Sequence, residues 1–370
     1  MGYVCFNCGR RYELSEKRFR CDCGGFLEVE VENIFPKGEL HRRDTSIWRY
    51  REAFGLPDDL EPVSLGEGGS PIIRRVLDGV PLYFKLDYMQ PTGSFKDRGA
   101  SVLMSLVKGL GVESVVEDSS GNAGAAVSAY AAAAGIGCTI FVPGYTPEGK
   151  LVQIQLYGSK VVKVPGKRQD ANDAAIEASN ESFYASHLWN PFFPMGLQSS
   201  AFEIWETFDG KLPESIVVPI GSGGYLEGLF LGFKRLREFG YAERIPRIVG
   251  VQAEKCPPVH RAFVEGLENY AEIEVEVTVA EGIAVQKPPR APAVLGAIRE
   301  SGGRTVSVSE EEIIESLGKL FKLGVFVEPT SAAVLAAWYK LEVTERENAL
   351  LILTGSGLKE VKKLVELFID

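Results

Sequence analysis

The 370-residue chain has no apolar run long enough to cross a membrane as a helix. Its first residues, MGYVCFNCGRRYE, contain no apolar stretch before the charges begin, so we expect no signal peptide and a cytoplasmic location. Positively charged residues are fewer than negatively charged ones. The chain has 40 lysines and arginines and 50 aspartates and glutamates, which gives a net charge of -10. This acidity argues against nucleic acid as the main partner. We therefore expect a small-molecule substrate as the partner, with neither nucleic acid nor membrane.

Histidine is scarce. The three histidines, His41, His187 and His260, are scattered along the chain, and we interpret none of them as a metal ligand or a catalytic base. No internal repeat and no low-complexity tract interrupts the sequence.

Cysteine is also scarce after residue 23, since four of the six cysteines lie within the first 23 residues. These four form the knuckles CxxCG and CxCGG: Cys5, Cys8, Cys21 and Cys23. Without a secretory signal, a disulfide framework is not expected. Four thiolates suit tetrahedral Zn²⁺, so the spacing predicts a structural zinc ribbon over residues 1–30. Four reduced cysteines without metal are the alternative.

After residue 60 the chain alternates between short apolar and longer amphipathic segments. Strands are predicted at 81–86, 112–117, 138–142, 160–164, 215–219, 247–252 and 349–353. Helices are predicted at 46–54, 98–109, 122–134, 147–157, 170–180, 225–239, 310–323 and 359–368. Ser309 and Glu312 fit a capping box at the start of one helix. Repeated strand–helix units predict an α/β fold with parallel sheets covered on both faces.

Three glycine-rich turns follow predicted strands, at the edge where open α/β sheets bind ligands. In SSGNAGAA (119–126), amides at a helix N-terminus favour an anion such as a carboxylate, and Asn122 adds a donor and an acceptor. Alternatively, Ser120 and Asn122 only cap the helix. In LTGSGLKE (353–360), the Thr354 hydroxyl either projects at the sheet edge or bonds the local backbone.

The third turn, PIGSGGYLEG (219–228), allows the backbone to curl around a phosphate through Gly221, Gly223 and Gly224. It has no Walker lysine, which disfavours a nucleoside triphosphate, and a purely structural turn is the alternative.

Lys96, in PTGSFKDRGA (91–100), is either a solvated surface charge or a reactive amine. A lysine in a dry cleft loses charge readily and forms Schiff bases with aldehydes. One amine, one phosphate cradle, one carboxylate-sized anion site and one hydroxyl together suit pyridoxal 5′-phosphate (PLP) and an amino-acid substrate.

The motifs LGEGGSP (65–71), PTGSFKDRG (91–99), SSGNAG (119–124), GSGG (221–224) and TGSGLK (354–359) resemble, in this order, those of the threonine synthase family. These are fold-type II PLP enzymes. The resemblance implies a tryptophan synthase β-like fold with two doubly wound open sheets and a homodimer. We expect a large PLP-binding domain from 31–95 and 205–370, a small domain from 96–204, and the zinc ribbon.

The resemblance also assigns roles. Lys96 is expected to bind the cofactor aldehyde and to act as catalytic acid and base. Asn122 is expected to bond the ring hydroxyl, and Thr354 to face the ring nitrogen. The cofactor phosphate is expected at Gly221, Ser222, Gly223 and Gly224. The substrate carboxylate is expected at Ser119, Ser120, Gly121 and Ala123. The implied reaction is a carbon–oxygen lyase reaction that converts O-phospho-L-homoserine and water to L-threonine and phosphate.

The substrate side departs from the family pattern. Residues 197–199 read Leu-Gln-Ser where Gln-Lys-Thr is usual, Ser356 replaces a common histidine, and residues 283–294 also differ. A paralogue acting on O-phosphoserine, serine or threonine, of the cysteate synthase, cysteine synthase or deaminase type, is therefore an alternative. A non-catalytic zinc-ribbon binding protein is a further one. Candidate cations for a substrate phosphate, or else solvated surface charges, are Lys150, Lys167, Arg168, Lys287 and Arg290.

Overall fold

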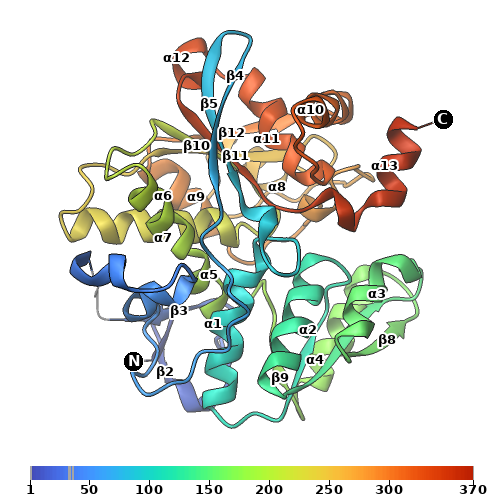
Figure 1. Cartoon of the computed structure of the whole chain (residues 1–370). Helices are drawn as coiled ribbons and strands as arrows, with labels where there is room; N and C mark the ends of the chain where they lie inside the picture. Colours follow the sequence, from blue (N-terminus) through green and yellow to red (C-terminus); the bar gives the residue numbers. More distant parts are fainter. Residues whose placement is uncertain (1, 32–34, 36, 370) are drawn as a thin grey trace. The chain divides into compact units, whose positions relative to one another are not determined.

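A computed structural model describes residues 2–31, 35 and 37–369 (Figure 1). The chain divides into two compact units. The first contains Met1–Gly69 and Lys96–Ser199, and the second contains Ser70–Phe95 and Ser200–Asp370. The three-domain division expected from the sequence stays a prediction. Within the described ranges, no helix combines the length and the apolar character that a membrane span requires.

The first unit begins with a small antiparallel sheet, ordered β2-β1-β3. Its strands are β1 (Gly2–Cys5), β2 (Arg11–Glu13) and β3 (Leu27–Glu30), with the 3₁₀ helix η1 (Leu14–Glu16) after β2. Two further 3₁₀ helices follow, η2 (Lys37–Arg42) and η3 (Ile47–Phe54). The Ser46 side chain accepts a hydrogen bond from the Trp48 amide, which caps η3. The helix predicted at 46–54 is therefore present, as a 3₁₀ helix.

The first unit also contains a parallel four-stranded sheet, ordered β8-β7-β6-β9. Its strands are β6 (Ser114–Glu117), β7 (Gly137–Pro143), β8 (Lys160–Val164) and β9 (Phe183–Tyr184). Its helices are α1 (Lys96–Gly109), α2 (Asn122–Ala134), α3 (Glu148–Leu156), α4 (Arg168–Ala178) and α5 (Phe192–Leu197). The predicted bounds of α2 and β8 are confirmed, whereas α1 begins two residues earlier than predicted, at Lys96 itself.

The second unit is built on a six-stranded sheet, ordered β12-β11-β10-β13-β5-β4. Its strands are β4 (Ile72–Leu77), β5 (Val80–Leu86), β10 (Ser215–Pro219), β11 (Arg247–Ala253), β12 (Arg304–Val308) and β13 (Ala349–Leu353). Neighbouring strands are parallel, except that the edge strand β4 runs antiparallel to β5. The 3₁₀ turns η4 (Asp87–Met89), η5 (Glu281–Ile283) and η6 (Gly357–Lys359) lie outside the strands. The helices are α6 (Ser199–Thr207), α7 (Gly224–Glu238), α8 (Pro258–Val264), α9 (Ala291–Glu300), α10 (Glu310–Lys322), α11 (Pro329–Tyr339), α12 (Val343–Arg346) and α13 (Val361–Phe368).

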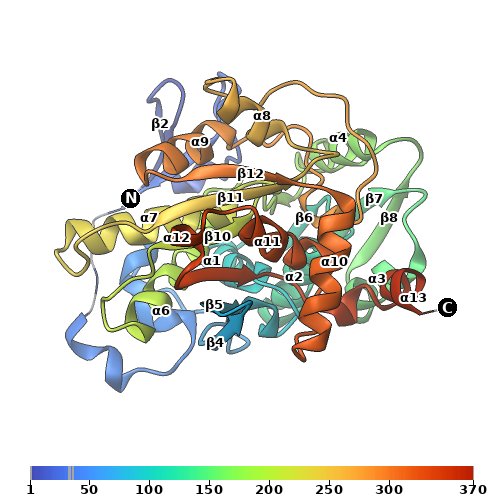
Figure 2. The ribbon, with the colours of Figure 1, turned by 90° about the horizontal axis from the view of Figure 1, so that it is seen from above.

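Both faces of this sheet are covered, as the α/β interpretation requires. Every residue of β10 and β13 is buried. Val217 and Leu351 share one apolar cluster with α10 and α11, and α11 lies across the central strands (Figure 2). Side chains alternate between the two faces of a strand. Gly250 of β11 therefore belongs to the face of the sheet opposite this apolar cluster. A Cβ on Gly250 would lie 3.2 Å from Leu226 of α7. The prediction of an α/β fold with parallel sheets is confirmed.

Candidate functional site

Lys96 is the first residue of α1 and is only partly exposed. Its side chain is half-buried, with Nζ 5.5 Å from the centroid of the Phe193 ring of α5. Helices α1 and α5 approach closely because small residues face the contact. A Cβ on Gly99 would lie 2.4 Å from the Phe193 ring, and one on Gly196 would lie 2.1 Å from the Arg98 carbonyl oxygen. The lysine stem is therefore placed against an aromatic ring by a tight helix pair.

The residues just before Lys96 belong to the second unit and are fixed there by the turn after β13. Ser94 forms an isolated β-bridge with Gly355. The Phe95 amide donates to the Thr354 carbonyl oxygen at 3.0 Å, and the Phe95 ring stacks on Tyr225 at 4.5 Å. The fully buried Ser94 hydroxyl finds no hydrogen-bond partner among the described residues. That hydroxyl is available to a ligand, and the sequence analysis had given it no role.

Thr354 is buried at the end of β13. Its hydroxyl lies 3.2 Å from the Ser331 hydroxyl, and the Ser331 oxygen accepts the amides of Thr354 and Gly355, both at 2.9 Å. The Thr354 hydroxyl therefore contacts a side chain at the start of α11. Ser331 received no role from the sequence, although the segment PTSAA marks a helix start rich in hydroxyl groups.

The glycine turn after β10 forms a cradle that side chains would fill. A Cβ on Gly221 would lie 2.9 Å from the Gly282 carbonyl oxygen. Gly223 has a φ of +86°, and its Cβ would lie 2.3 Å from Val294. The turn opens the 15-residue helix α7, whose first amides have no partner within the helix, and this suits a phosphate. Because β10 and β13 are parallel neighbours, the turn and Thr354 follow adjacent strand ends. The turn holds the predicted residues Gly221, Ser222, Gly223 and Gly224.

The SSGN loop connects β6 to α2 in the first unit. The N-cap of α2 is Gly121, which has no side chain with which to cap the helix. The loop folds back tightly, since a Cβ on Gly124 would lie 1.9 Å from the Ser119 carbonyl oxygen. The first amides of α2 have no partner within the helix, which suits an anion. The loop and first turn hold the predicted residues Ser119, Ser120, Gly121, Asn122 and Ala123.

The predicted residues therefore fall into two groups. The first unit holds Lys96 and the SSGN loop on the packed helices α1 and α2. The second unit holds the glycine turn and Thr354 on neighbouring strands. Within the second unit, a glycine turn at a helix N-terminus and a buried hydroxyl at the neighbouring strand end suit a phosphate-bearing ligand.

His187 received no role from the sequence, yet the structure places it against the buried carboxyl of Glu117 in the first unit. Its Nδ1 lies 2.6 Å from Oε1 of Glu117, and Glu117 is the last residue of β6. Burial, followed by the charge of Lys96, holds the pKa of the His187 imidazole well below its usual range. Burial, followed by the neighbouring Asp118 carboxylate, holds the pKa of Glu117 well above its usual range. Two acids at the end of an apolar strand, VVED, were the signal available in the sequence.

Most of the candidate cations for a substrate phosphate either form ion pairs with buried carboxylates or lie exposed. Arg168 pairs with the buried Asp118 at 2.6 Å. Arg290 is buried and pairs with the buried Glu227 through two nitrogens, at 2.5 and 2.6 Å. Lys150 is half-buried, and Lys167 and Lys287 are exposed.

The segment that departs from the family pattern is buried. Ser199 accepts a hydrogen bond from Arg98 at 2.9 Å and donates to the Gly196 carbonyl oxygen at 2.7 Å. Gln198 is fully buried, and its Oε1 has no hydrogen-bond partner among the residues that the structure describes.

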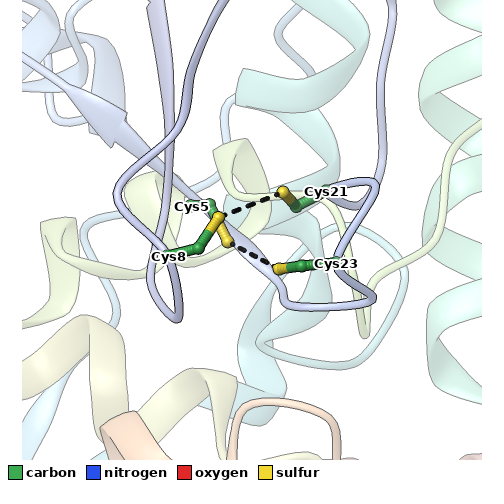
Figure 3. Close-up of side chains that lie close together, drawn as sticks. All are labelled: Cys5, Cys8, Cys21 and Cys23. Atoms are coloured by element: carbon green, nitrogen blue, oxygen red, sulfur yellow. Dashed lines mark hydrogen bonds between the residues drawn. The ribbon is translucent and has the colours of Figure 1, made fainter.

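The four N-terminal cysteines converge beside the small antiparallel sheet (Figure 3). Their sulfur atoms all lie within 4.8 Å of one another, with Cys5–Cys23 at 3.5 Å and Cys8–Cys21 at 3.6 Å. Four sulfurs about 2.3 Å from one ion would lie about 3.8 Å apart, so this spacing fits a tetrahedral metal site. Burial opposes ionisation of Cys21, but hydrogen bonds, first that of the Tyr12 hydroxyl, lower the pKa of its thiol to about 6.

Comparison with known proteins agrees with this geometry. The model of a family described as "Pyridoxal-phosphate dependent enzyme" matches residues 63–355. A threonine synthase of Methanocaldococcus jannaschii is 35% identical and covers 96% of this chain and 92% of its own length. A threonine synthase of Methanosarcina acetivorans is 34% identical, with 98% and 93% covered.

Two solved structures show the same fold. A threonine deaminase from T.th. superimposes with a TM-score of 0.67 at 26% identity, covering 78% of this chain and 92% of its own. Maize serine racemase gives a TM-score of 0.68 at 21% identity, covering 80% and 92%.

Proposed function

Because the chain belongs to the pyridoxal-phosphate dependent enzyme family, we propose that it is a PLP-dependent threonine synthase, a lyase that forms L-threonine and phosphate from O-phospho-L-homoserine and water. Its similarity to threonine synthases over nearly the whole chain supports this substrate. The observation that carries the chemistry is the placement of Lys96, half-buried against Phe193 and directly after a segment fixed by the Thr354 turn. An amine in such a place is held for reaction rather than for solvation.

Each residue of the site has a separate role in this proposal. PLP, when bound, draws electrons away from the substrate carbon that bears the amino group. The Lys96 amine would hold the cofactor aldehyde and would move protons at the substrate carbons. The glycine turn at Gly221–Gly224 would hold the cofactor phosphate, and Asn122 would bond the ring hydroxyl. The Thr354 hydroxyl would be the partner of the ring nitrogen.

The substrate carboxylate is assigned to amides of the SSGN loop. Ser119, Ser120, Gly121 and Ala123 would hold it at the N-terminus of α2, where the helix dipole favours negative charge. The position of this loop at the start of the 13-residue helix α2 supports the assignment.

A deaminase acting on threonine or serine is the second candidate. Two observations favour it: the structural likeness to a threonine deaminase, and the ion pairs that occupy Arg168 and Arg290. Both pairs reduce the number of cations open to a substrate phosphate.

The test is a substrate panel. We expect the purified protein to release phosphate and L-threonine from O-phospho-L-homoserine, and to show an absorbance band that borohydride abolishes. The variant Lys96→Ala should lose the band and about 10²-fold or more in rate. The control is Lys108→Ala on the same helix, an exposed lysine paired with Glu61, which should keep both. Keto-acid formation from threonine, without phosphate release from O-phospho-L-homoserine, would establish the deaminase instead.

The cysteine cluster is proposed to hold a structural Zn²⁺ in a zinc ribbon. Four protein ligands leave no open position, so the metal would stabilise the small sheet and take no part in turnover. Elemental analysis should find one zinc per chain, and Cys8→Ser should lose it. Cys138→Ser and Cys256→Ser lie outside the cluster and should retain the metal. Full metal content in the Cys8→Ser protein would refute the site.

Two further expectations remain proposals: a homodimer, which the resemblance to threonine synthases implies, and a cytoplasmic location. Light scattering of the purified protein tests the first, and fractionation of cells tests the second. The three-domain division at residues 1–30, 31–95 with 205–370, and 96–204 remains a proposal, which limited proteolysis can examine.

A further inference from the structure

The buried ion pair between Arg290 and Glu227 in the second unit has no part in the function proposed above. Two nitrogens of the Arg290 guanidinium donate to the two carboxylate oxygens of Glu227, at 2.5 and 2.6 Å. Both side chains are almost completely shielded from solvent. Removing two charges from water is costly, and the bidentate contact offsets part of that cost. The pair is therefore a specific feature of the interior of this unit.

The pair lies one helical turn from the glycine turn that suits a phosphate. The Glu227 amide donates to the carbonyl oxygen of Gly223, the N-cap of α7, at 3.0 Å. The Val294 amide donates to the carbonyl oxygen of Arg290, the N-cap of α9, at 3.1 Å. Gly223 and Val294 are themselves neighbours, because a Cβ on Gly223 would lie 2.3 Å from a Val294 methyl carbon. The ion pair therefore joins α7 and α9 beside the place where α9 contacts the glycine turn.

The charge of Glu227 matters for a phosphate at this turn. The first amides of α7 and the helix dipole favour an anion there. Because Cα–Cβ bonds tilt toward the N-terminus of a helix, the Glu227 side chain leans toward the same turn. Without a cation beside it, this carboxylate would repel a bound phosphate. A second buried carboxylate near the start of α7, that of Asp87, accepts a hydrogen bond from Tyr225 and lies 3.8 Å from the Lys85 amine.

We propose that Arg290 is a positioning residue that neutralises Glu227 and so allows the glycine turn to bind the cofactor phosphate. The inference rests on the part of the proposed function in which this turn holds the phosphate of PLP. Arg290 acts through Glu227, because its guanidinium donates to both carboxylate oxygens. It belongs to residues 283–294, the segment in which the chain departs from the threonine synthase pattern.

The experiment compares PLP with pyridoxal, which has the same ring and aldehyde but no phosphate. Both are titrated into the full-length protein after removal of bound cofactor, and quenching of tryptophan fluorescence gives the two dissociation constants. In Arg290→Gln, the constant for PLP should rise about tenfold or more, while that for pyridoxal should stay within about threefold. In Glu227→Gln, the uncompensated Arg290 cation should tighten PLP binding by about threefold or more.

Three further variants complete the set. The double variant Arg290→Gln/Glu227→Gln carries no charge at the pair, so its PLP affinity should return to within about threefold of the original. Arg290→Lys keeps a cation beside Glu227 and should retain most of the PLP affinity. The matched control is Lys234→Gln, which breaks an exposed pair with Glu300 that joins the same two helices farther from the turn. This control should change neither constant.

An ion pair that only holds the helices together predicts a different pattern, since either single variant would then weaken PLP and pyridoxal alike. Equal changes for the two ligands, an unchanged PLP affinity in Arg290→Gln, or weaker PLP binding in Glu227→Gln would overturn the inference. If Arg290→Gln does not fold, Glu227→Gln still decides, because only the electrostatic role predicts tighter binding of PLP.

These constants are measured without turnover, so the two proposals can fail separately. Threonine formation without the expected changes in the two constants would retain the proposed function and reject the role of Arg290. The expected changes without threonine formation would retain that role and reject threonine synthesis. An unsubstituted protein that bound PLP no more tightly than pyridoxal would reject the phosphate site and, with it, the role of Arg290.

Discussion

At the scale of single residues, Lys85 is the clearest case of a charge placed where water cannot reach it. The side chain is fully buried on β5, and Nζ donates to Glu203 at 2.7 Å and to the Ser70 hydroxyl at 2.8 Å. Asp87 lies 3.8 Å away and accepts hydrogen bonds from Ser70 and Tyr225. One buried cation therefore holds two buried carboxylates in the second unit.

This cluster bears on the lysine site through Tyr225. The Tyr225 hydroxyl donates to Asp87, and the Tyr225 ring stacks on Phe95, the residue before Lys96. The Ser200 hydroxyl lies 2.8 Å from the same Tyr225 oxygen. A change in the cluster should therefore disturb the segment that leads to Lys96.

We predict that Lys85→Met destabilises the protein by about 3–5 kcal/mol, because it leaves Glu203 and Asp87 buried without their cation. Unfolding in urea followed by circular dichroism measures the loss. The control is Lys108→Met, which breaks an exposed pair with Glu61 and should cost less than about 1 kcal/mol. Equal losses in the two variants would mean that the buried cluster adds nothing beyond a surface ion pair.

At the scale of elements, the sequence was most informative where a local signal and burial agree. The strands at 160–164, 215–219 and 349–353 were predicted with the bounds that the structure shows, as was the helix at 122–134. The capping box at Ser309 and Glu312 is also confirmed: each side chain bonds the backbone amide of the other residue. These features depend on neighbouring residues alone, so pattern and propensity were sufficient.

Elements without such a local signal were missed. Helix α11 reads PTSAAVLAAWY and is buried on all sides, with only Tyr339 left partly accessible, so it shows no amphipathic period. The edge strand β4 alternates half-buried and exposed residues and was not recognised. The short helices α5 and α6 were also missed, although α5 supplies the Phe193 ring that contacts Lys96.

The candidate site was also predicted only in part from the sequence. The three glycine turns were found because each follows an apolar strand and opens a helix or 3₁₀ turn, which is a local pattern. The partners of the turn residues could not be found, because Ser331 lies 23 residues from Thr354, and His187 lies 70 residues from Glu117. Contacts over such separations depend on the tertiary fold, which a single sequence does not reveal by spacing.

At the scale of the whole molecule, burial of titratable groups makes stability depend on pH. Burial, as the first cause, lowers the pKa of His187 in the first unit and of His260 in the second. The unfolded chain binds a proton at each histidine below about pH 6.5, whereas the native protein resists it. Stability is therefore lost as the pH falls below about 6.5. Glu117 acts in the opposite direction, since its raised pKa keeps it protonated in the native protein, and stability is lost as the pH rises above about 4.5.

We predict that the urea midpoint falls as the pH is lowered from 7 to 5.5, and that two substitutions change this slope in opposite directions. His260→Gln removes a destabilising protonation and should flatten the slope. Glu117→Gln removes the opposing carboxyl but keeps a hydrogen-bonding partner for His187, so it should steepen the slope. The exposed His41→Gln serves as the control and should leave the slope unchanged. If Glu117→Gln flattened the slope as His260→Gln does, the carboxyl would have to be charged in the native protein, which would contradict its raised pKa.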